Sequence, residues 1–398
     1  MKKYVNHKLM SHTDSDNPQS AIRNPQSGGR PTWAEVDLNV LIHNYRTLAT
    51  LTDARVLPVV KANAYGHGAV AVARALADEG ATAFVVAIVE EGLELRQAGI
   101  TQDILVLQGA WPGQEDAAVR NRLIPAVFSA ESVGRLEQAA CRASEPVRVH
   151  VKVDTGMTRL GVPWNSMESL LAALGRAGRV RVSGTFSHFA CSEENDPAFN
   201  RKQMRRFQQA VKNIRGAGLD PGELHLSNSG GMLYCGYARN LSARPGIALY
   251  GYPPAPERSP VVLKPVLSLK TRIARIHTIS AGESVGYNRT FTAARATPVA
   301  TLPIGYADGY DRGLSNRGKV IIRDRWAPVL GRVSMDLITV DVTALPEVSV
   351  GEEVTLLGSS ENCTMDAATW AGLLGTIPYE ILTNIGSRVP RIYHEPLH

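Results

Sequence analysis

The stretch RVLPVVKANAYGHG, residues 55–68, decides between two α/β folds that this chain could adopt. The apolar run over Arg55–Lys61 predicts a buried parallel strand. A doubly wound sheet usually carries a glycine-rich dinucleotide turn directly after its first strand. Here KANAY, residues 61–65, stands at that place. The stretch therefore favours a closed (β/α)8 barrel.

Seven more apolar runs follow, with amphipathic, alanine-rich stretches between them and Gly or Pro at the junctions. Eight strands in about 200 residues fit a (β/α)8 TIM-type barrel. Helices are expected at Ala69–Glu79, Glu90–Ala98, Ala130–Ala143 and Asn200–Gly216. The later strands are expected at Phe84–Ile88, Ile104–Gln108, Ile124–Phe128, Val147–Asp154, Arg181–His188, Glu223–Ser229 and Ser242–Ala248.

The alternation of expected strands and helices ends at about residue 260. Beyond it, short apolar runs separated by turns predict a mainly β C-terminal domain. We expect the barrel over residues 41–260 and the β domain over residues 261–398. A strand within residues 31–40 is expected to join the β domain. Residues 1–30 are polar and repeat the segment NPQS, so a disordered N-terminal extension is expected there. The β domain should hold strands at Val266–Ile279, Thr297–Pro303, Lys319–Arg323, Trp326–Ser334, Leu337–Val342 and Glu353–Gly358, and a helix over Asp366–Leu374.

Composition excludes several classes of protein. Of 398 residues, 44% are hydrophobic and 20% charged, as in ordinary globular proteins. No apolar stretch is long enough for a membrane span. The net charge of +6 comes from scattered Lys and Arg, so no nucleic-acid partner is expected. The four cysteines and ten histidines show no metal-binding spacing, which predicts no metal site and reduced thiols in the cytoplasm.

Polar side chains stand at the C-terminal ends of the expected strands, where such barrels carry their chemistry. Each has an ordinary structural explanation, such as a solvated loop lysine or a structural histidine. Their placement on one face of the barrel suggests a common site. They are Lys61, Lys152, Asp154, Arg159, His188, Asn228, Ser229 and Arg244, the last followed by Gly246 and Ile247.

Two features of this face indicate a cofactor. Ser229 and the backbone near Gly246 follow strands seven and eight, where barrels commonly bind phosphate. Lys61 follows an apolar strand, and burial lowers the pKa of an amine and suits it to form a Schiff base. A phosphate site beside a desolvated lysine predicts pyridoxal phosphate.

Residues 59–68, VVKANAYGHG, resemble the cofactor-lysine signature of the alanine racemases, which are pyridoxal-phosphate enzymes of fold type III. Other segments resemble the same family, in order along the chain to its C-terminus. They are KVDTGMTRLG (152–161), SHFA (187–190), NS (228–229), RPGIALYG (244–251), VGY (285–287), GYADG (305–309), GRVSMD (331–336) and PYE (378–380).

The resemblance implies a homodimer in which each barrel mouth borrows residues from the partner's β domain. Arg159 and the backbone of Met335 would orient the substrate carboxylate, and Lys152 and Asp336 would support them. Tyr306, Arg312 and Arg332 would line the substrate entryway. The residues implied to hold the cofactor are Lys61, Tyr65, His188, Asn228, Ser229, Arg244, Gly246, Ile247 and Tyr379.

The resemblance further implies interconversion of L-alanine and D-alanine by two bases, Lys61 and Tyr287 of the partner subunit, to supply D-alanine for peptidoglycan. A serine or broad-spectrum racemase is an alternative. A non-enzymatic pyridoxal-phosphate protein is a lesser one, because such proteins lack the second domain, and a fold type III decarboxylase is disfavoured by the racemase motifs in that domain. The chain departs from the family at Asn288-Arg289, where small residues are usual.

Overall fold

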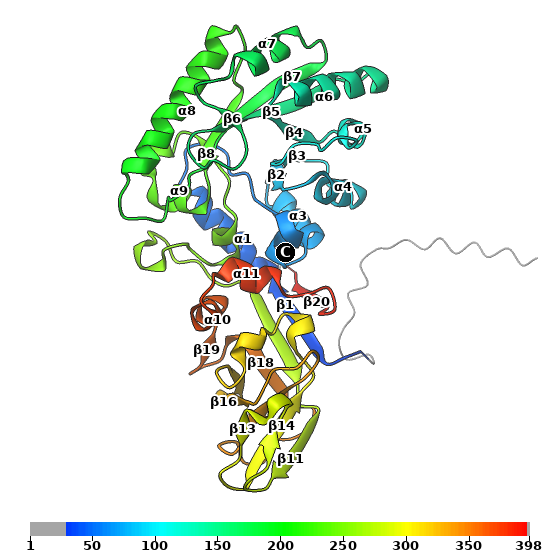
Figure 1. Cartoon of the computed structure of the whole chain (residues 1–398), viewed down its shortest axis with the longest axis vertical. Helices are drawn as coiled ribbons and strands as arrows, with labels where there is room; N and C mark the ends of the chain where they lie inside the picture. Colours follow the sequence, from blue (N-terminus) through cyan, green and yellow to red (C-terminus); the bar gives the residue numbers. More distant parts are fainter. Residues whose placement is uncertain (1–28, 396–398) are drawn as a thin grey trace, which may run out of the picture.

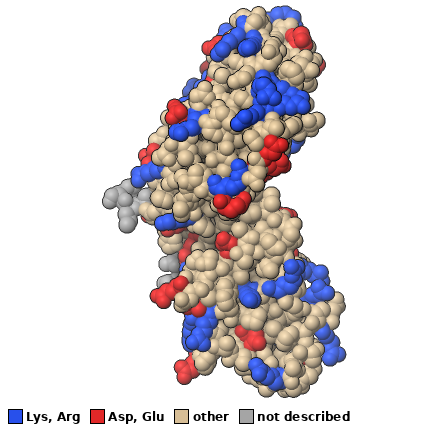
Figure 2. All heavy atoms as spheres, turned by 90° about the vertical axis from the view of Figure 1, so that its left-hand side faces the viewer, with Lys and Arg blue, Asp and Glu red and all other residues tan. Residues whose placement is uncertain are grey.

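The computed structural model describes residues 29–395. The chain is elongated, with a barrel at one end and a mainly β domain at the other (Figure 1). On the face seen in Figure 2, Lys and Arg are spread over both ends with Asp and Glu among them. The expected disordered extension, residues 1–30, lies outside the described residues except for its last two.

Eight parallel strand segments close the barrel, which confirms the predicted fold class. Residues 55–60 close the ring, because Val56 bridges Ala243 and Val59 bridges Val85, both in parallel. Leu57 N–H donates to the Ala243 carbonyl at 2.8 Å, and Val60 N–H donates to the Val85 carbonyl at 2.9 Å. The other strands follow in the order β2 (Ala83–Val86), β3 (Asp103–Val106), β4 (Ile124–Val127), β5 (Val147–Asp154), β7 (Val180–Phe186), β8 (Glu223–Ser227) and β9 (Ser242–Ala243), with β6 (Val162–Pro163) beside β5.

Amphipathic helices cover the outside of the barrel. In α6 (Ala130–Ala143) the buried Val133, Leu136 and Ala140 recur at helical spacing, and the Ser129 hydroxyl accepts from Ser132 N–H and caps the first turn. The helix spans the residues that the sequence predicts. The others are α3 (Ala69–Asp78), α4 (Val89–Gln97), α5 (Glu115–Arg120), α7 (Glu168–Arg176), α8 (Ala198–Gly216) and α9 (Ser229–Tyr234). The short segment α2 (Lys61–Tyr65) is instead a left-handed turn after the closing strand.

The β domain is built on one sheet with the order β11-β14-β17-β16-β15-β18-β10-β1-β20. The N-terminal strand β1 (Thr32–Asp37) pairs antiparallel with β10 and parallel with β20. The single strand expected over Val266–Ile279 is two strands, β10 (Leu267–Arg272) and β11 (Arg275–Ile279), because the chain crosses at Ile273 from one part of the sheet to another. The remaining strands are β12 (Ser284–Val285), β13 (Phe291–Thr292), β14 (Thr297–Leu302), β15 (Lys319–Ile322), β16 (Arg325–Leu330), β17 (Ile338–Asp341), β18 (Glu353–Ser359), β19 (Thr364–Met365) and β20 (Arg391–His394).

Three helices lie where the barrel meets the β domain: α1 (Leu38–Ala49), α10 (Ala367–Leu374) and α11 (Pro378–Thr383) (Figure 1). One cluster of buried apolar side chains runs through this junction from the barrel into the β sheet. Among residues 29–395, none of the helices has the length and hydropathy required to cross a membrane.

Asn44 is a buried polar link at this junction. Its Nδ2 donates to the carbonyls of Leu249 (3.1 Å) and Lys264 (2.8 Å), and its Oδ1 accepts from Lys264 N–H (3.0 Å). The side chain is fully buried. It therefore ties α1 to the segment that leaves the barrel for the β domain.

Asn44→Ala should lower the free energy of unfolding by about 3 kcal/mol, because it leaves three polar backbone groups of the junction without partners. Urea denaturation at neutral pH measures the change. His43→Ala, at an exposed position of the same helix, should change stability by less than about 0.5 kcal/mol. Equal effects of the two substitutions would contradict the role given to Asn44.

Candidate active site

The C-terminal ends of the barrel strands bring most of the predicted site residues together. Lys61 follows the closing strand, and Lys152 lies near the end of β5. His188 follows β7, Ser229 follows β8, and Arg244 follows β9. The predicted convergence at one mouth is therefore present in the fold.

The chain turns sharply after Lys61. Ala62, Asn63, Ala64 and Tyr65 all have φ between 51° and 54°, a left-handed helical turn made by non-glycine residues. Such a conformation costs roughly 1–2 kcal/mol per residue, so surrounding contacts must hold it. Gly66 (φ 83°) ends the turn, and a Cβ there would lie 2.2 Å from the Leu382 carbonyl oxygen on α11. The turn fixes both Lys61 and Tyr65 against the junction helices.

Several side chains hold this left-handed turn. The Asn63 side-chain oxygen accepts from Ala69 N–H at 2.8 Å, at the start of α3. His67 Nδ1–H donates to the Ala64 and Tyr65 carbonyls at 3.0 and 2.9 Å. The Glu91 carboxylate accepts from Ala62 N–H at 2.6 Å. Asn63, His67 and Glu91 were not singled out from the sequence, because their contacts depend on a backbone conformation that the residue types do not predict.

Tyr65, Ser229, Gly246 and Tyr379 form a small cradle. The Ser229 hydroxyl accepts from the N–H groups of Gly246 (2.9 Å) and Ala248 (3.2 Å). A Cβ on Gly246 would lie 2.2 Å from the Tyr65 hydroxyl, so only glycine allows this approach. The Tyr65 and Tyr379 rings lie 6.1 Å apart between centroids. Hydroxyl and backbone N–H groups therefore converge here, and these are the kinds of group that ligate anions in proteins.

Ile247 and Asn228 flank the cradle. Ile247 is buried at the start of the short helix η2 (Ile247–Tyr250). The Asn228 side-chain oxygen caps α9 by accepting from Gly231 N–H at 2.8 Å. Its Nδ2 lies 3.4 Å from His188 Nε2. Asn228 thus links the cradle to His188.

Arg244 is a buried cation with neutral partners. Its Nη2 donates to the Ser187 carbonyl (2.6 Å) and lies 3.3 Å from His188 Nδ1. Its Nη1 donates to His225 Nδ1 at 2.6 Å. Among the described residues, no carboxylate forms an ion pair with Arg244. Burial lowers the pKa of Arg244 to about 9, which leaves the group cationic at neutral pH.

His225 is a contact of Arg244 that the sequence analysis missed. A guanidinium only donates, so His225 Nδ1 must accept, and His225 carries its proton on Nε2. That Nε2 lies 2.8 Å from His150 Nδ1. Burial, and then the Arg244 charge, hold the pKa of His225 well below its usual range. The sequence does place His225 between two leucines of an expected barrel strand, a pattern that indicates a buried histidine.

Positive charge dominates the open part of the mouth. Burial is the largest cause that lowers the pKa of Lys61, and Arg159 lowers it further, whereas Glu91 raises it. Burial, followed by Arg244 and Arg159, lowers the pKa of Lys152 to about 8. Lys152 Nζ donates to the Leu107 carbonyl at 3.1 Å. Both amines thus lose a proton more readily than a lysine in water.

Apart from Tyr379 on α11, which belongs to the cradle, the predicted site residues of the β domain form no hydrogen bond or ring contact with this mouth among the described residues. Tyr287 begins the short helix η4 (Tyr287–Arg289) between β12 and β13, on the part of the chain away from the barrel (Figure 1). Tyr287 is 71% and Met335 51% exposed. Within residues 29–395, no hydrogen bond or ring contact joins either of them to the barrel residues.

The β-domain loops are instead bound to one another. Tyr306 N–H and Ala307 N–H donate to the carbonyls of Ser334 and Met335, each at 3.1 Å. Asp336 pairs with Arg388 at 2.6 Å. Tyr306 and Arg312 begin the short helices η5 (Tyr306–Asp308) and η6 (Arg312–Leu314). Arg332 lies in the loop that follows β16.

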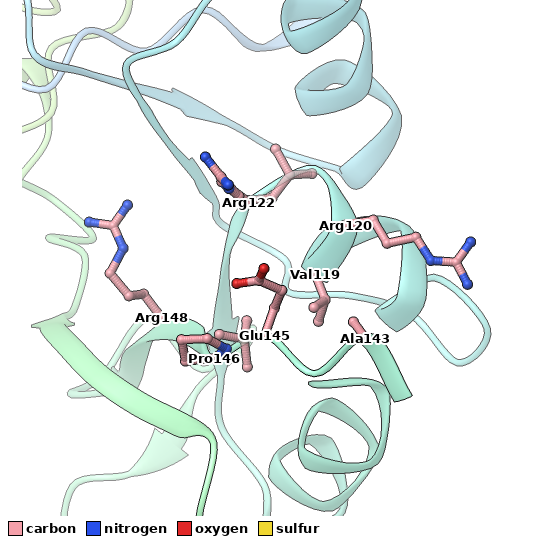
Figure 3. A pocket seen from close by; sticks show the side chains of 9 residues that line it. Val119, Arg120, Arg122, Ala143, Glu145, Pro146 and Arg148 are labelled. Atoms are coloured by element: carbon pink, nitrogen blue, oxygen red, sulfur yellow. The ribbon is translucent and has the colours of Figure 1, made fainter. Parts of the chain in front are cut away.

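A hollow of about 520 Å³ lies at the opposite end of the barrel (Figure 3). Arg122, Glu145 and Arg148 line it, beside the starts of β4 and β5. In these barrels the chemistry sits at the C-terminal ends of the strands. The hollow is therefore separate from the candidate active site.

Comparisons with known proteins agree on one family. The family described as "Alanine racemase, N-terminal domain" matches residues 36–254, and "Alanine racemase, C-terminal domain" matches residues 266–393. An alanine racemase of Geobacter sulfurreducens is 44% identical, over 92% of this chain and 98% of its own length.

Two solved structures are similar over the same extent. The alanine racemase from Bacillus anthracis with bound L-Ala-P has a TM-score of 0.88 and 35% identity, over 92% of this chain and 96% of that chain. The alanine racemase from Bartonella henselae with covalently bound pyridoxal phosphate has a TM-score of 0.82 and 32% identity, over 92% of this chain and all of that chain.

Low pH should destabilise the fold through its buried neutral histidines. Burial lowers the pKa of His67 to about 4, and burial followed by Arg244 lowers that of His150 to about 3. An unfolded histidine takes up its proton near pH 6.5. Between pH 7 and pH 5 the unfolded chain gains protons that the folded chain does not, which removes about 2 kcal/mol of stability per histidine.

Urea denaturation at pH 7 and pH 5 measures this loss. His67→Asn should reduce the difference between the two pH values by about 2 kcal/mol, because it removes one such histidine. His43→Asn, at an exposed position, should leave the difference unchanged. A stability that does not fall between pH 7 and pH 5 would contradict the neutral, buried state of these histidines.

Proposed function

The chain belongs to the alanine racemase family, and on that premise we propose that it is a pyridoxal-phosphate-dependent racemase that interconverts L-alanine and D-alanine. The observation that carries the proposal is the mouth of the barrel, where Lys61, with its lowered pKa, and the cradle of Tyr65, Ser229 and Gly246 lie together. We propose that the protein acts in the cytoplasm and supplies D-alanine for peptidoglycan synthesis.

The residues present fit this cofactor. The cradle offers hydroxyl and N–H groups, and Gly246 allows the Tyr65 hydroxyl to approach where a Cβ would clash with it. Such groups bind a phosphate without a lysine for each charge. Tyr65, Ser229, Gly246, Ile247 and Tyr379 would hold the phosphate. Lys61 would bind the cofactor covalently. When bound, pyridoxal phosphate would spread the negative charge that develops at the substrate Cα.

Arg244 would face the ring nitrogen of the cofactor, with His188 and Asn228 beside it. A guanidinium keeps its own protons, so it would donate a hydrogen bond to that nitrogen and leave it unprotonated. His225 and Ser187 hold two of the Arg244 nitrogens at 2.6 Å, which fixes the direction of the remaining donors. An acidic residue at this place would act in the opposite way, because it would keep the nitrogen protonated.

Racemisation needs a base on each face of the substrate Cα. Lys61 is suited to one face, because burial and Arg159 favour its neutral amine. Tyr287 of the partner subunit would serve the other face. Arg159 would bind the substrate carboxylate, with the backbone of Met335 of the partner subunit, and Lys152 and Asp336 would support this arrangement. Tyr306, Arg312 and Arg332 would line the entryway.

The active form would be a homodimer, because one chain carries only part of this site. Tyr287 and Met335 are exposed, and within the described residues neither forms a hydrogen bond or ring contact with the barrel mouth of its own chain. Dissociation should therefore remove the second base from every site.

A chiral assay tests the proposal directly. We expect the purified, cofactor-loaded protein to form D-alanine from L-alanine rapidly and little D-serine from L-serine. Lys61→Ala should reduce the rate by roughly 100-fold or more, because it removes one base and the cofactor link. Comparable D-serine formation would indicate a broad-spectrum racemase, and absence of any D product from the loaded dimer would overturn the proposal.

Tyr287→Phe tests the two-base assignment. Removing the phenolic hydroxyl should slow racemisation by roughly 100-fold, because the L face loses its base. Exchange of the Cα deuteron of D-alanine with solvent should persist, since Lys61 still serves the D face. Mass spectrometry of each enantiomer measures this exchange. Equal loss of exchange from L-alanine and D-alanine would contradict the assignment. Tyr306→Phe, which removes a hydroxyl of the proposed entryway, is the control and should not produce this difference between the enantiomers.

A further inference from the structure

Glu91 connects three backbone segments near Lys61. Its Oε1 accepts from Ala62 N–H at 2.6 Å, the first amide of the left-handed turn. Its Oε2 accepts from Ala87 N–H at 2.7 Å and from Ile88 N–H at 3.4 Å, directly after β2. Glu91 itself lies in the first turn of α4. One half-buried carboxylate therefore ties the residue after Lys61 to the neighbouring barrel strand.

The turn needs this tie because its residues do not favour the conformation. Ala62 is exposed and has φ 51°, so no packing of its methyl group holds it in the left-handed region. The Ala62 amide is also the point where Lys61 leaves the closing strand. Releasing that amide would let the chain relax toward negative φ and carry Lys61 with it.

Glu91 also supplies negative charge in a positive environment. Lys61 interacts electrostatically with Arg159, Lys152, His188 and Glu91. Glu91 is the one acidic residue of these four. The Tyr65 ring lies 5.9 Å from Lys61 Nζ. The adjacent Glu90 is exposed and accepts from Gln114 Nε2 at 2.6 Å, away from the turn. Glu91 therefore contacts the turn after Lys61, whereas Glu90 does not.

We propose that Glu91 is a positioning residue for Lys61: its carboxylate holds the left-handed turn that fixes the point where Lys61 leaves the barrel strand, and it provides the negative charge near the lysine amine. That Lys61 is the reacting amine rests on the proposed function. The hold on the turn rests on the hydrogen bonds of Glu91 alone.

Hydrogen–deuterium exchange in the full-length, cofactor-loaded protein tests the hold on the turn. Glu91→Ala should speed exchange of the Ala62 amide by roughly 10- to 100-fold, because the amide loses a bond to a charged acceptor. Glu90→Ala removes a neighbouring carboxylate from the same helix start and should leave that exchange unchanged. Unchanged exchange in Glu91→Ala would overturn the proposal.

A rescue separates strain in the turn from a general loss of structure. In Glu91→Ala the relaxed turn should also speed exchange of the Ala64 amide, which donates to the Val60 carbonyl at 2.8 Å across the turn. Adding Ala62→Gly should slow exchange of the Ala64 amide again by about fivefold, because glycine adopts left-handed φ without a steric penalty. Ala62→Gly in the native background should have little effect on exchange. If glycine at position 62 gives no recovery, Glu91 does not act through the conformation of the turn, and the proposal fails.

Labelling of the lysine amine in the full-length, cofactor-free protein tests the charge. Trinitrobenzenesulfonate reacts with the neutral amine, and peptide mass spectrometry follows Lys61 across pH. Glu91→Gln keeps an acceptor for Ala62 N–H but removes the charge, so the labelling midpoint should move to lower pH. Glu90→Gln should not move it. An unmoved midpoint in Glu91→Gln would contradict the electrostatic part of the proposal.

These measurements are independent of racemase activity. Exchange at Ala62 and labelling of Lys61 report on the turn and the amine whether or not D-alanine forms. Failure of the chiral assay with the expected exchange and labelling would overturn the proposed function and leave the positioning role intact. Normal racemisation with unchanged exchange in Glu91→Ala would overturn the positioning role alone.

Discussion

The buried guanidinium of Arg244 sets the protonation of the barrel interior. It lies among neutral imidazoles and backbone carbonyls instead of beside a carboxylate. A buried cation of this kind must satisfy its donors, because each unpaired charged group in the interior is strongly destabilising. Its field lowers the pKa of His150, His188 and Lys152 in addition to the effect of burial. Because a guanidinium only donates, His225 Nδ1 must accept from Arg244, and the His225 proton lies on Nε2, toward His150.

Closure of the barrel is the second constraint, and it places Lys61 at the start of a strained turn that the surrounding contacts hold. The closing strand, residues 55–60, touches β9 on one side and β2 on the other. The chain must then pass beneath α11 without a Cβ at Gly66. A left-handed turn achieves this over a short distance. The same turn brings Tyr65 against Gly246, so the lysine and the cradle depend on one local conformation.

Much of this arrangement could be predicted from the sequence. The periodicity of apolar residues predicted the barrel and the mainly β domain, because burial imposes a period of two in strands and 3.6 in helices. The turn after Lys61, the contact between His225 and Arg244, and the role of Glu91 could not be predicted in this way. Each depends on a backbone angle or on a pairing between distant strands, which residue types alone do not specify. The break of the expected strand at Ile273 has the same origin.

The division of the predicted residues between two domains has a physical consequence. The barrel mouth holds hydroxyl and backbone N–H groups beside a lysine whose pKa is lowered by burial, and within the described residues neither Tyr287 nor Met335 of the same chain bonds to it. The loops that carry Tyr287, Met335 and Tyr306 are fixed by bonds among themselves, such as those from Tyr306 to Ser334 and from Ala307 to Met335. A preformed surface loses little conformational entropy when it docks. The β domain can therefore present its loops to another chain as a rigid unit, which favours a site completed by association over one completed by folding of a single chain.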